Sequence, residues 1–310
     1  MAELGKTAPS IRFLDEETLR PLLRLEDLIP AMERALADFS AGRVVQPVRS
    51  IVPVTEHRGF MGVMPAVYGD VMGAKLVTFY PANAALHKPT HQAMIQLFDA
   101  TTGEPLAVMD GRLITEMRTA AVSAIAADLL APRNPHLLAI LGSGVQARSH
   151  FAALSRVRTF KEIRVWSRTP AHAQKFAGEI GARTAARPEQ AVAEADIVLT
   201  LTSSPEPILF GKWLKNDAIV CAVGAVTPNR RELDTEAMRG PIVVESREAA
   251  EREPGDIVLA NAQISAELGE LLAGKALERK DGPIVFKSVG IAIEDIAAAK
   301  LVYEKIAGGP

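Results

Sequence analysis

Hydrophobic and polar residues follow two different patterns along this chain, and the change falls near residue 130. Before it, residues 26–39 carry apolar side chains at the three- and four-residue spacing of an amphipathic helix. Short runs rich in β-branched and aromatic residues follow and predict strands, with a turn at residues 99–103 between the last two. The predicted strands are 48–54, 60–64, 75–80, 93–98 and 105–109. This pattern is typical of an α+β domain whose strands pair with near neighbours.

A turn-rich stretch at residues 131–135 opens a regular alternation of strands and helices. The apolar runs here are continuous, which indicates strands of a parallel sheet that is covered on both faces. Strands are predicted at 136–141, 162–166, 195–201, 218–223, 241–245 and 284–286, and helices at 147–157, 171–180 and 288–306.

We therefore expect an α/β protein in which a Rossmann-type, doubly wound parallel sheet is inserted into an α+β domain. The inserted domain is predicted to span residues 129–284. The segments 1–128 and 285–310 are predicted to form the α+β domain. The last helix is assigned to this domain because the six strands of the parallel sheet are already accounted for without it.

Composition and charge narrow the function classes but do not identify an activity. The chain has 310 residues, and 35 Lys and Arg against 37 Asp and Glu give a formal net charge of −2. This balance lacks the basic surface of a nucleic-acid or anionic-membrane binder. No apolar stretch reaches the ~20 residues of a membrane span, and the first ten residues lack the apolar core of a secretory signal. We expect a cytoplasmic location.

The single cysteine, Cys221, lies within an apolar run. One cysteine cannot form an internal disulfide, which fits a reducing compartment. We interpret Cys221 as a small buried hydrophobic residue rather than as a nucleophile.

A glycine-rich turn follows the first strand of the inserted domain. Residues 142–147 read Gly-Ser-Gly-Val-Gln-Ala and fit the G-x-G-x-x-A pattern in its required context, after a strand and before a helix. Gly142 permits the tight turn, Gly144 lets the backbone approach a pyrophosphate, and Ala147 permits close helix packing. The start of the helix offers unpaired N–H groups to phosphate oxygens. The sequence predicts a dinucleotide site, with a plain strand-to-helix turn as the alternative.

The end of the second strand decides between the two nicotinamide dinucleotides. An acid is expected there if the ribose carries a free 2′-hydroxyl, but the sequence has Ser167, Arg168 and Thr169. Arg168 can pair with a 2′-phosphate, and the two hydroxyls can donate hydrogen bonds to it. We therefore predict NADPH as the cofactor. The alternative is that Arg168 is a solvated loop residue and the cofactor is NADH.

Three cations stand in apolar or small-residue runs outside the inserted domain: Arg49, Lys75 and Arg118. A buried cation is costly unless it meets an anion. One interpretation is a substrate carboxylate held by both guanidinium groups with Lys75 beside it. The other is three separate ion pairs, for instance Arg118 with Glu116 or Asp110, and the pattern alone does not separate the two.

The chain resembles the ornithine cyclodeaminase and mu-crystallin family over nearly its whole length, and most closely the mu-crystallin branch, whose members are ketimine reductases. The segments that carry the resemblance are QPVRS at 46–50, HRGFMGVMPA at 57–66, KLVTFY at 75–80, LAVMDG at 106–111, RTAAVSAIA at 118–126, EPILFG at 206–211 and FKSVG at 286–290.

The resemblance implies a homodimer formed through the α+β domain, which would also bind the substrate. It implies that Arg49, Lys75 and Arg118 line the substrate site and that no metal takes part. The residues implied to contact the cofactor are Thr90, His91, Gln92, Arg118, Gly142, Ser143, Gly144, Val145, Gln146, Ser167, Arg168, Thr169, Thr202, Val223 and Ser288.

Two departures from the cyclodeaminase branch favour reduction over deamination. The positions of its catalytic aspartate and active-site glutamate align with Val226 and Gly62. Loss of ammonia needs a base at the amino group, which neither residue supplies. We expect NADPH-dependent reduction of a small cyclic imine carboxylate such as piperideine-2-carboxylate or pyrroline-2-carboxylate. A protonated imine can be reduced by positioning and hydride transfer without a carboxylic acid.

Two other functions stay open. An amino-acid enzyme with a different base would act as an ornithine cyclodeaminase or as a relative of alanine dehydrogenase. The resemblance to mu-crystallins also implies a binding protein that holds thyroid hormone in an NADPH-dependent manner or serves as a lens crystallin. The cations that bind a substrate carboxylate could then bind that of an iodothyronine. His91 is a candidate proton relay, with a hydrogen-bonding loop residue as the alternative.

Overall fold

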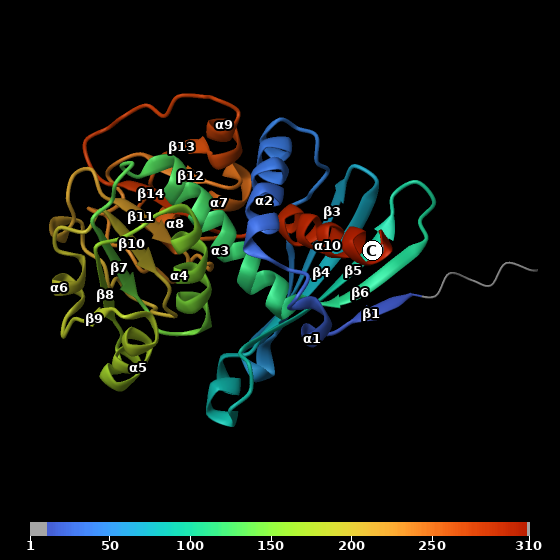
Figure 1. Ribbon diagram of the computed structural model, residues 1–310, viewed down its shortest axis with the longest axis horizontal. Helices are drawn as coiled ribbons and strands as arrows, with labels where there is room; N and C mark the ends of the chain where they lie inside the picture. The colour runs from blue at the N-terminus through green and yellow to red at the C-terminus, as the bar shows by residue number, and fades with distance from the viewer. Residues whose placement is uncertain (1–10, 309–310) are drawn as a thin grey trace, which may run out of the picture. The chain divides into compact units, whose positions relative to one another are not determined.

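The computed structural model describes residues 11–308, which form two compact units (Figure 1). The first unit comprises the described parts of Met1–Arg24 and Ala292–Pro310 together with Gly42–Thr115, and the second comprises Leu25–Ala41 and Glu116–Ile291. The expectation that the first ten residues are no secretory signal lies outside the described residues.

The first unit is built on a six-stranded sheet in the order β1-β6-β5-β4-β3-β2. Neighbouring strands run antiparallel, except β1 and β6, which are parallel. The strands are β1 (Arg12–Leu14), β2 (Ser50–Val54), β3 (Gly59–Tyr68), β4 (Val71–Phe79), β5 (His91–Asp99) and β6 (Pro105–Asp110), with helix α1 (Glu16–Leu19) and 3-10 helices at Thr55–His57 and Pro81–Leu86. The strands predicted in this part of the chain are all present, and the turn predicted at 99–103 joins β5 to β6.

The last helix, α10 (Ala292–Ala307), covers one face of this sheet and packs on β3, β4 and β5 (Figure 1). Gly73 on β4 allows this close approach, because a Cβ there would lie 2.8 Å from Cδ1 of Ile296 on α10. The covered face carries buried side chains in register, with Lys75 directly between Met64 of β3 and Ile95 of β5.

The opposite face of the same sheet is also apolar, although its side chains are only half-buried or exposed. Register pairs place Phe13 beside Val108, Val63 beside Leu76, and Met72 beside both Val67 and Phe98. Phe13 is 75% exposed. A sheet with one covered and one solvated face normally alternates apolar and polar residues, so this second apolar face requires an explanation.

The second unit is built on a parallel sheet of eight strands in the order β13-β12-β14-β11-β10-β7-β8-β9. From β7 the chain runs to β8 and β9 on one side and to β10 and β11 on the other. This reversal makes a topological switch point at the carboxyl ends of β7 and β10. The strands are β7 (Leu137–Leu141), β8 (Glu162–Trp166), β9 (Arg183–Thr184), β10 (Ile197–Thr200), β11 (Ile219–Ala222), β12 (Ile242–Val244), β13 (Ile264–Glu267) and β14 (Ile284–Lys287). The predicted Rossmann-type sheet is confirmed.

Helices complete the second unit. They are α2 (Leu25–Ser40), α3 (Gly111–Leu130), α4 (Val145–Val157), α5 (Pro170–Ile180), α6 (Pro188–Val192), α7 (Arg247–Ala250), α8 (Gly255–Val258) and α9 (Leu268–Leu272), with a 3-10 helix at Gly211–Trp213; the first turn of α3 belongs to the first unit. Within residues 11–308, no helix combines the length and the apolar character that crossing a membrane requires.

The two units differ from the predicted division at α2, α3 and β14. Helix α2 packs on α9, where Gly269 lies so close that a Cβ would stand 2.0 Å from the carbonyl oxygen of Leu36. Ser40 at the end of α2 donates to Oε2 of Glu267 at 2.7 Å. β14 pairs with β11 and β12 inside the second sheet. The apolar face of α2 is visible in the sequence, but the sequence does not show which surface it covers.

Candidate functional site

The glycine turn lies between β7 and α4 at the switch point of the second unit. Gly142 has φ +134°, and a Cβ there would lie 2.6 Å from the carbonyl oxygen of Leu201. Gly144 precedes α4, receives no side-chain cap, and has no atom within 4 Å of an added Cβ. The side-chain oxygen of Gln146, in the first turn of α4, is buried without a hydrogen-bond partner. An uncapped helix start with free N–H groups and the open space at Gly144 fit a bound dinucleotide pyrophosphate.

Hydrogen bonds hold this turn in place. Nη1 of Arg148 donates to the carbonyl oxygens of Ser143 at 2.8 Å and Gly144 at 3.1 Å, and Nη2 donates to Glu179 at 2.8 Å. Oγ of Ser143 donates to Oγ of Ser167 at 3.0 Å. The structure thus brings the glycine turn to the end of β8, where Arg168 and Thr169 follow, and Arg168 is exposed.

A buried carboxylate that the sequence reasoning missed holds the ends of β10 and β11. Glu232 is fully buried and accepts hydrogen bonds from Oγ1 of Thr200 (2.9 Å), the amide of Thr202 (2.7 Å), Oγ1 of Thr202 (2.6 Å) and the amide of Gly224 (2.7 Å). Burial raises the pKa of Glu232, while the nearby Lys287 ammonium opposes this rise. These bonds fix the two loops that carry Thr202 and Val223, both predicted neighbours of the cofactor.

A second buried carboxylate, Glu245, holds the turn after β14. It accepts from Oγ of Ser288 at 2.7 Å and from the amides of Val289 at 2.9 Å and Gly290 at 3.3 Å. Gly290 has φ +67°, and a Cβ there would lie 2.6 Å from Nη1 of Arg118. The turn that carries Ser288 therefore lies against Arg118, which the sequence predicted as a site residue 170 positions earlier in the chain.

In the first unit, Lys75 points into the layer between the sheet and α10. It is 2% exposed, and its Nζ lies 2.5 Å from Oδ2 of Asp295, which is fully buried. Nζ also lies 3.5 Å from Oγ1 of Thr115 at the start of α3. Lys75 therefore has a buried carboxylate partner, as the alternative of separate ion pairs expects, although the sequence reasoning did not identify Asp295 as that partner. Asp295 was missed because it lies at the start of the last helix, where an acid ordinarily stabilises the helix end.

The other residues predicted in the first unit lie at strand ends. His91 opens β5, its ring centroid lies 4.5 Å from that of Phe79, and its Nδ1 lies 3.4 Å from Oγ1 of Thr90. Desolvation of the ring, and secondarily the charge of Lys75, lower the pKa of His91, which favours neutral imidazole. Gln92 is exposed, and Arg49 is half-buried immediately before β2.

Cys221 is buried in β11, and burial raises the pKa of its thiol to about 12, so its interpretation as an inert core residue is confirmed. Among residues 11–308, no cluster of His, Cys, Asp and Glu side chains could hold a metal ion.

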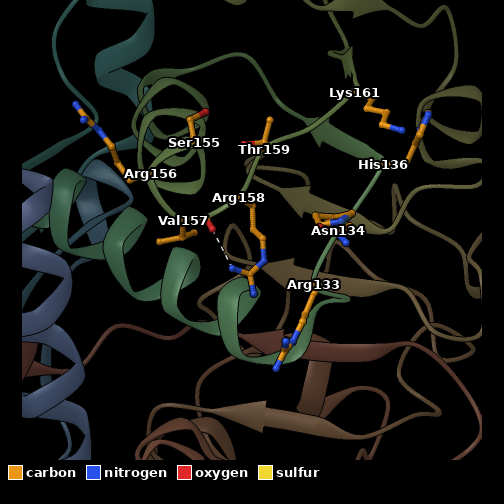
Figure 2. A pocket seen from close by; sticks show the side chains of 10 residues that line it. Arg133, Asn134, His136, Ser155, Arg156, Val157, Arg158, Thr159 and Lys161 are labelled. Atoms are coloured by element: carbon orange, nitrogen blue, oxygen red, sulfur yellow. Dashed lines mark hydrogen bonds between the residues drawn. The ribbon is translucent and has the colours of Figure 1, made fainter.

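A basic hollow of about 670 Å³ lies at the opposite end of the parallel sheet, where β7 and β8 begin (Figure 2). It is lined by residues 133–136, 155–159 and 161, which include Arg133, His136, Arg156, Arg158 and Lys161. Arg158 donates back to the carbonyl oxygen of Val157 at 2.9 Å and pairs with Asp128. Because ligands of open α/β sheets bind at the carboxyl ends of the strands, this hollow is not the candidate cofactor site.

Comparison with known proteins gives a consistent picture. The family model described as "Ornithine cyclodeaminase/mu-crystallin family" matches residues 12–310. The chain is 49% identical to ketimine reductase mu-crystallin of Mus musculus over 98% of this chain and 99% of that protein. It is 36% identical to Delta(1)-pyrroline-2-carboxylate reductase of Bacillus cereus (strain ZK / E33L), over 92% of this chain and 94% of that protein.

A solved structure has the same fold throughout. Delta(1)-pyrroline-2-carboxylate reductase of Thermococcus litoralis, in complex with NADH and L-proline, superposes with a TM-score of 0.91 at 35% identity. The match covers 96% of this chain and 98% of that chain.

Proposed function

The chain belongs to the ornithine cyclodeaminase/mu-crystallin family, and from this premise we propose that it is a nicotinamide-dependent reductase of cyclic ketimine carboxylates. The observation that carries the proposal is the near-full-length similarity to a mouse ketimine reductase. The Bacillus and Thermococcus relatives are named for the same chemistry, reduction of a C=N bond next to a carboxylate. Piperideine-2-carboxylate and pyrroline-2-carboxylate are the substrates to test first.

We propose NADPH as the preferred cofactor. The end of β8 offers a guanidinium and two hydroxyls in Ser167, Arg168 and Thr169, and no carboxylate that would repel a 2′-phosphate. The Thermococcus relative was solved with NADH, so both dinucleotides have to be compared.

The bound nicotinamide supplies a hydride to the imine carbon, and the side chains of this protein orient the substrate and provide the proton. In our assignment, Arg49 and Arg118 bind the substrate carboxylate through their planar N–H groups. The ammonium of Lys75 donates one proton to the imine nitrogen, and solvent then restores that proton. One hydride and one proton together convert the C=N bond to the CH–NH of the cyclic amino acid.

The decisive experiment follows the oxidation of NADPH by purified protein on addition of piperideine-2-carboxylate, with NADH in parallel. We expect turnover to fall about 10- to 150-fold in Arg49→Ala, which removes a charged contact worth roughly 1.5–3 kcal/mol. In Lys75→Ala, which removes the proton donor, it should fall about 100-fold or more. Arg133→Ala, which alters the hollow in Figure 2, is the matched control and should retain wild-type activity. Absence of turnover with every cyclic ketimine contradicts the proposal.

The same protein preparation tests the other two functions. Ammonia release from ornithine, lysine or alanine with NADP⁺ would identify an amino-acid dehydrogenase or deaminase instead. Tight binding of an iodothyronine in the presence of NADPH, without turnover of any imine, would identify a hormone-binding protein.

We also propose that the protein is a homodimer formed through the apolar outer face of the six-stranded sheet. Phe13, Val63, Leu76, Met94 and Val108 share this face, where α10 does not pack. Apolar surface of this kind is favourable to bury against a partner, and a second copy of this chain presents the same surface. A C2 arrangement would bring the two sheets face to face.

A further inference from the structure

Two lysine–aspartate pairs in the described residues are almost completely buried, and they differ in what surrounds them. In the second unit, Lys287 lies 3.0 Å from Asp256, whose other oxygen accepts the amides of Glu232 at 2.8 Å and Leu233 at 2.9 Å. Asp256 therefore has a clear structural role. In the first unit, Lys75 lies 2.5 Å from Asp295, in a register row whose neighbours, Met64 and Ile95, are apolar.

Two contacts of α10 with the first unit fix the position of Asp295 next to Lys75. Oε1 of Gln46 accepts the amide of Ile293 at 2.6 Å, which fixes the start of α10. Gly73, two residues before Lys75, removes the Cβ that would collide with Ile296 one residue after Asp295. The first turn of α10 thus lies directly on the part of β4 that carries Lys75.

We propose that Asp295 is the positioning residue that keeps Lys75 protonated and aimed for proton delivery to the imine. This inference rests on the proposed function. Asp295 itself does not touch the substrate; it acts through Lys75. A buried lysine without an anion loses its proton readily, and a neutral amine cannot donate to the imine nitrogen in the reduction. The carboxylate therefore sets the pH range in which the enzyme can work.

The groups that face Lys75 support this direction. Asp295 is the carboxylate in contact with it, and Glu294 is the other buried acid in the first turn of α10. Thr115 contributes a neutral hydroxyl from α3, and His91 on β5 has its pKa lowered, so it adds no stable positive charge. Replacing Asp295 by Asn removes the carboxylate that contacts the Lys75 ammonium, and burial then favours the neutral amine.

The test compares Asp295→Asn with Asp295→Glu and with Asp256→Asn, which breaks the equally buried pair of the second unit. In Asp295→Asn, the basic limb of the pH profile of kcat/KM for piperideine-2-carboxylate should move down by at least one pH unit. Asp295→Glu keeps the negative charge, so the basic limb should move less in this variant than in Asp295→Asn. Asp256→Asn should lower the melting temperature without moving that limb.

A second readout does not depend on turnover. In full-length protein labelled at the lysine ε-carbon, NMR titration should show Lys75 losing its proton at lower pH in Asp295→Asn than in wild type. An unchanged Lys75 titration, or an equal shift of the pH limb in Asp256→Asn, overturns the inference. If wild type reduces no imine, the proposed function fails, whereas the NMR titration still decides whether Asp295 controls Lys75.

Discussion

Arg168 is the side chain on which the choice between NADPH and NADH is proposed to depend. It is exposed at the end of β8, beside Ser167, which is joined to the glycine turn through Ser143. Replacing Arg168 by Ala removes a charge-assisted contact to the 2′-phosphate, worth roughly 1.5–3 kcal/mol. We expect the KM for NADPH to rise about 10- to 100-fold while that for NADH stays within twofold. Steady-state kinetics with both cofactors measures this, and an equal effect on both would contradict the assignment.

His150 makes the stability of the second unit depend on pH. Its Nδ1 lies 2.8 Å from the carbonyl oxygen of Gln146, which assigns the proton to this nitrogen, and Nε2 accepts from Oγ of Ser123 at 3.0 Å. Burial, and secondarily the charge of Arg118, lower the pKa of His150 from 6.5 to about 4, against the opposing effect of the Gln146 carbonyl.

The sign of the pH effect follows from this lowered pKa. The unfolded chain takes up the proton near pH 6.5 and the folded chain only near pH 4, so the stability is fully present above pH 6.5 and falls between these values. The full difference corresponds to ~3 kcal/mol. His150→Gln cannot titrate, and its urea midpoint should fall less between pH 7 and pH 4 than that of wild type. Parallel midpoint curves would refute this effect.

At the residue scale, the sequence indicates which side chains are unusual but not what they meet. Lys75 and Arg118 stand out as cations in apolar runs, and both are buried, at 2% and 4% exposed. Their surroundings come from distant parts of the chain: Asp295 from the last helix for Lys75, and the Gly290 turn for Arg118. Glu232 was missed because a single acid in a loop normally indicates a solvated residue, whereas here it accepts four hydrogen bonds.

Among the elements, the β7–α4 turn uses its two glycines in different ways. Gly142 has φ +134° and faces a backbone oxygen, so Gly142→Ala should destabilise the fold by ~2 kcal/mol or more. Gly144 has φ −82° and open space around it, so Gly144→Ala should leave the melting temperature within about 2 °C of wild type.

Gly144→Ala should weaken cofactor binding, although it leaves the stability of the fold almost unchanged. The added methyl group of Gly144→Ala occupies the space predicted for the pyrophosphate, so the Kd for NADPH should rise at least tenfold. Thermal unfolding and a fluorescence titration with NADPH measure the two properties separately. Normal NADPH binding by Gly144→Ala would indicate that the dinucleotide does not bind at this turn.

Prediction of elements succeeded where hydrophobic periodicity is clear and failed where burial removes it. The second strand of the parallel sheet was predicted at 162–166 and is found at Glu162–Trp166. Helix α3 was missed because residues 119–127 are all buried, so no polar face marks a helical period. β3 was predicted to stop before Pro65 but continues to Tyr68, because β2 does not pair with β3 at Pro65 and no ladder hydrogen bond is lost there.

For the whole molecule, the apolar outer face of the first sheet leads to a prediction about oligomeric state. Sedimentation velocity should show a dimer, and Phe13→Asp should raise its dissociation constant at least tenfold by placing a charge in the interface. Leu259→Glu is the control. Leu259 is an exposed apolar residue like Phe13, with 52% of its surface accessible, but it lies in the second unit. A monomeric wild type, or equal weakening by both variants, would reject the proposed interface.

The fold class could be predicted from the sequence because the change from α+β to strand–helix alternation is visible in the hydrophobic pattern. The exact division of the chain could not be predicted. Helix α2 belongs to the second unit because of its contacts with Gly269 and Glu267, more than 200 residues away. Contacts of such long sequence separation leave no trace in the local pattern that produced the predicted boundaries.

The position of α10 at the end of the chain has a consequence for biosynthesis. The strands of the first sheet leave the ribosome within the first 110 residues, whereas the helix that covers their inner face comes last. During the synthesis of more than 180 intervening residues, the row around Lys75 is without its cover and its counter-charge. A nascent chain that stalls before residue 292 would therefore expose the inner face of this sheet, which is apolar surface of the kind that chaperones and proteases bind.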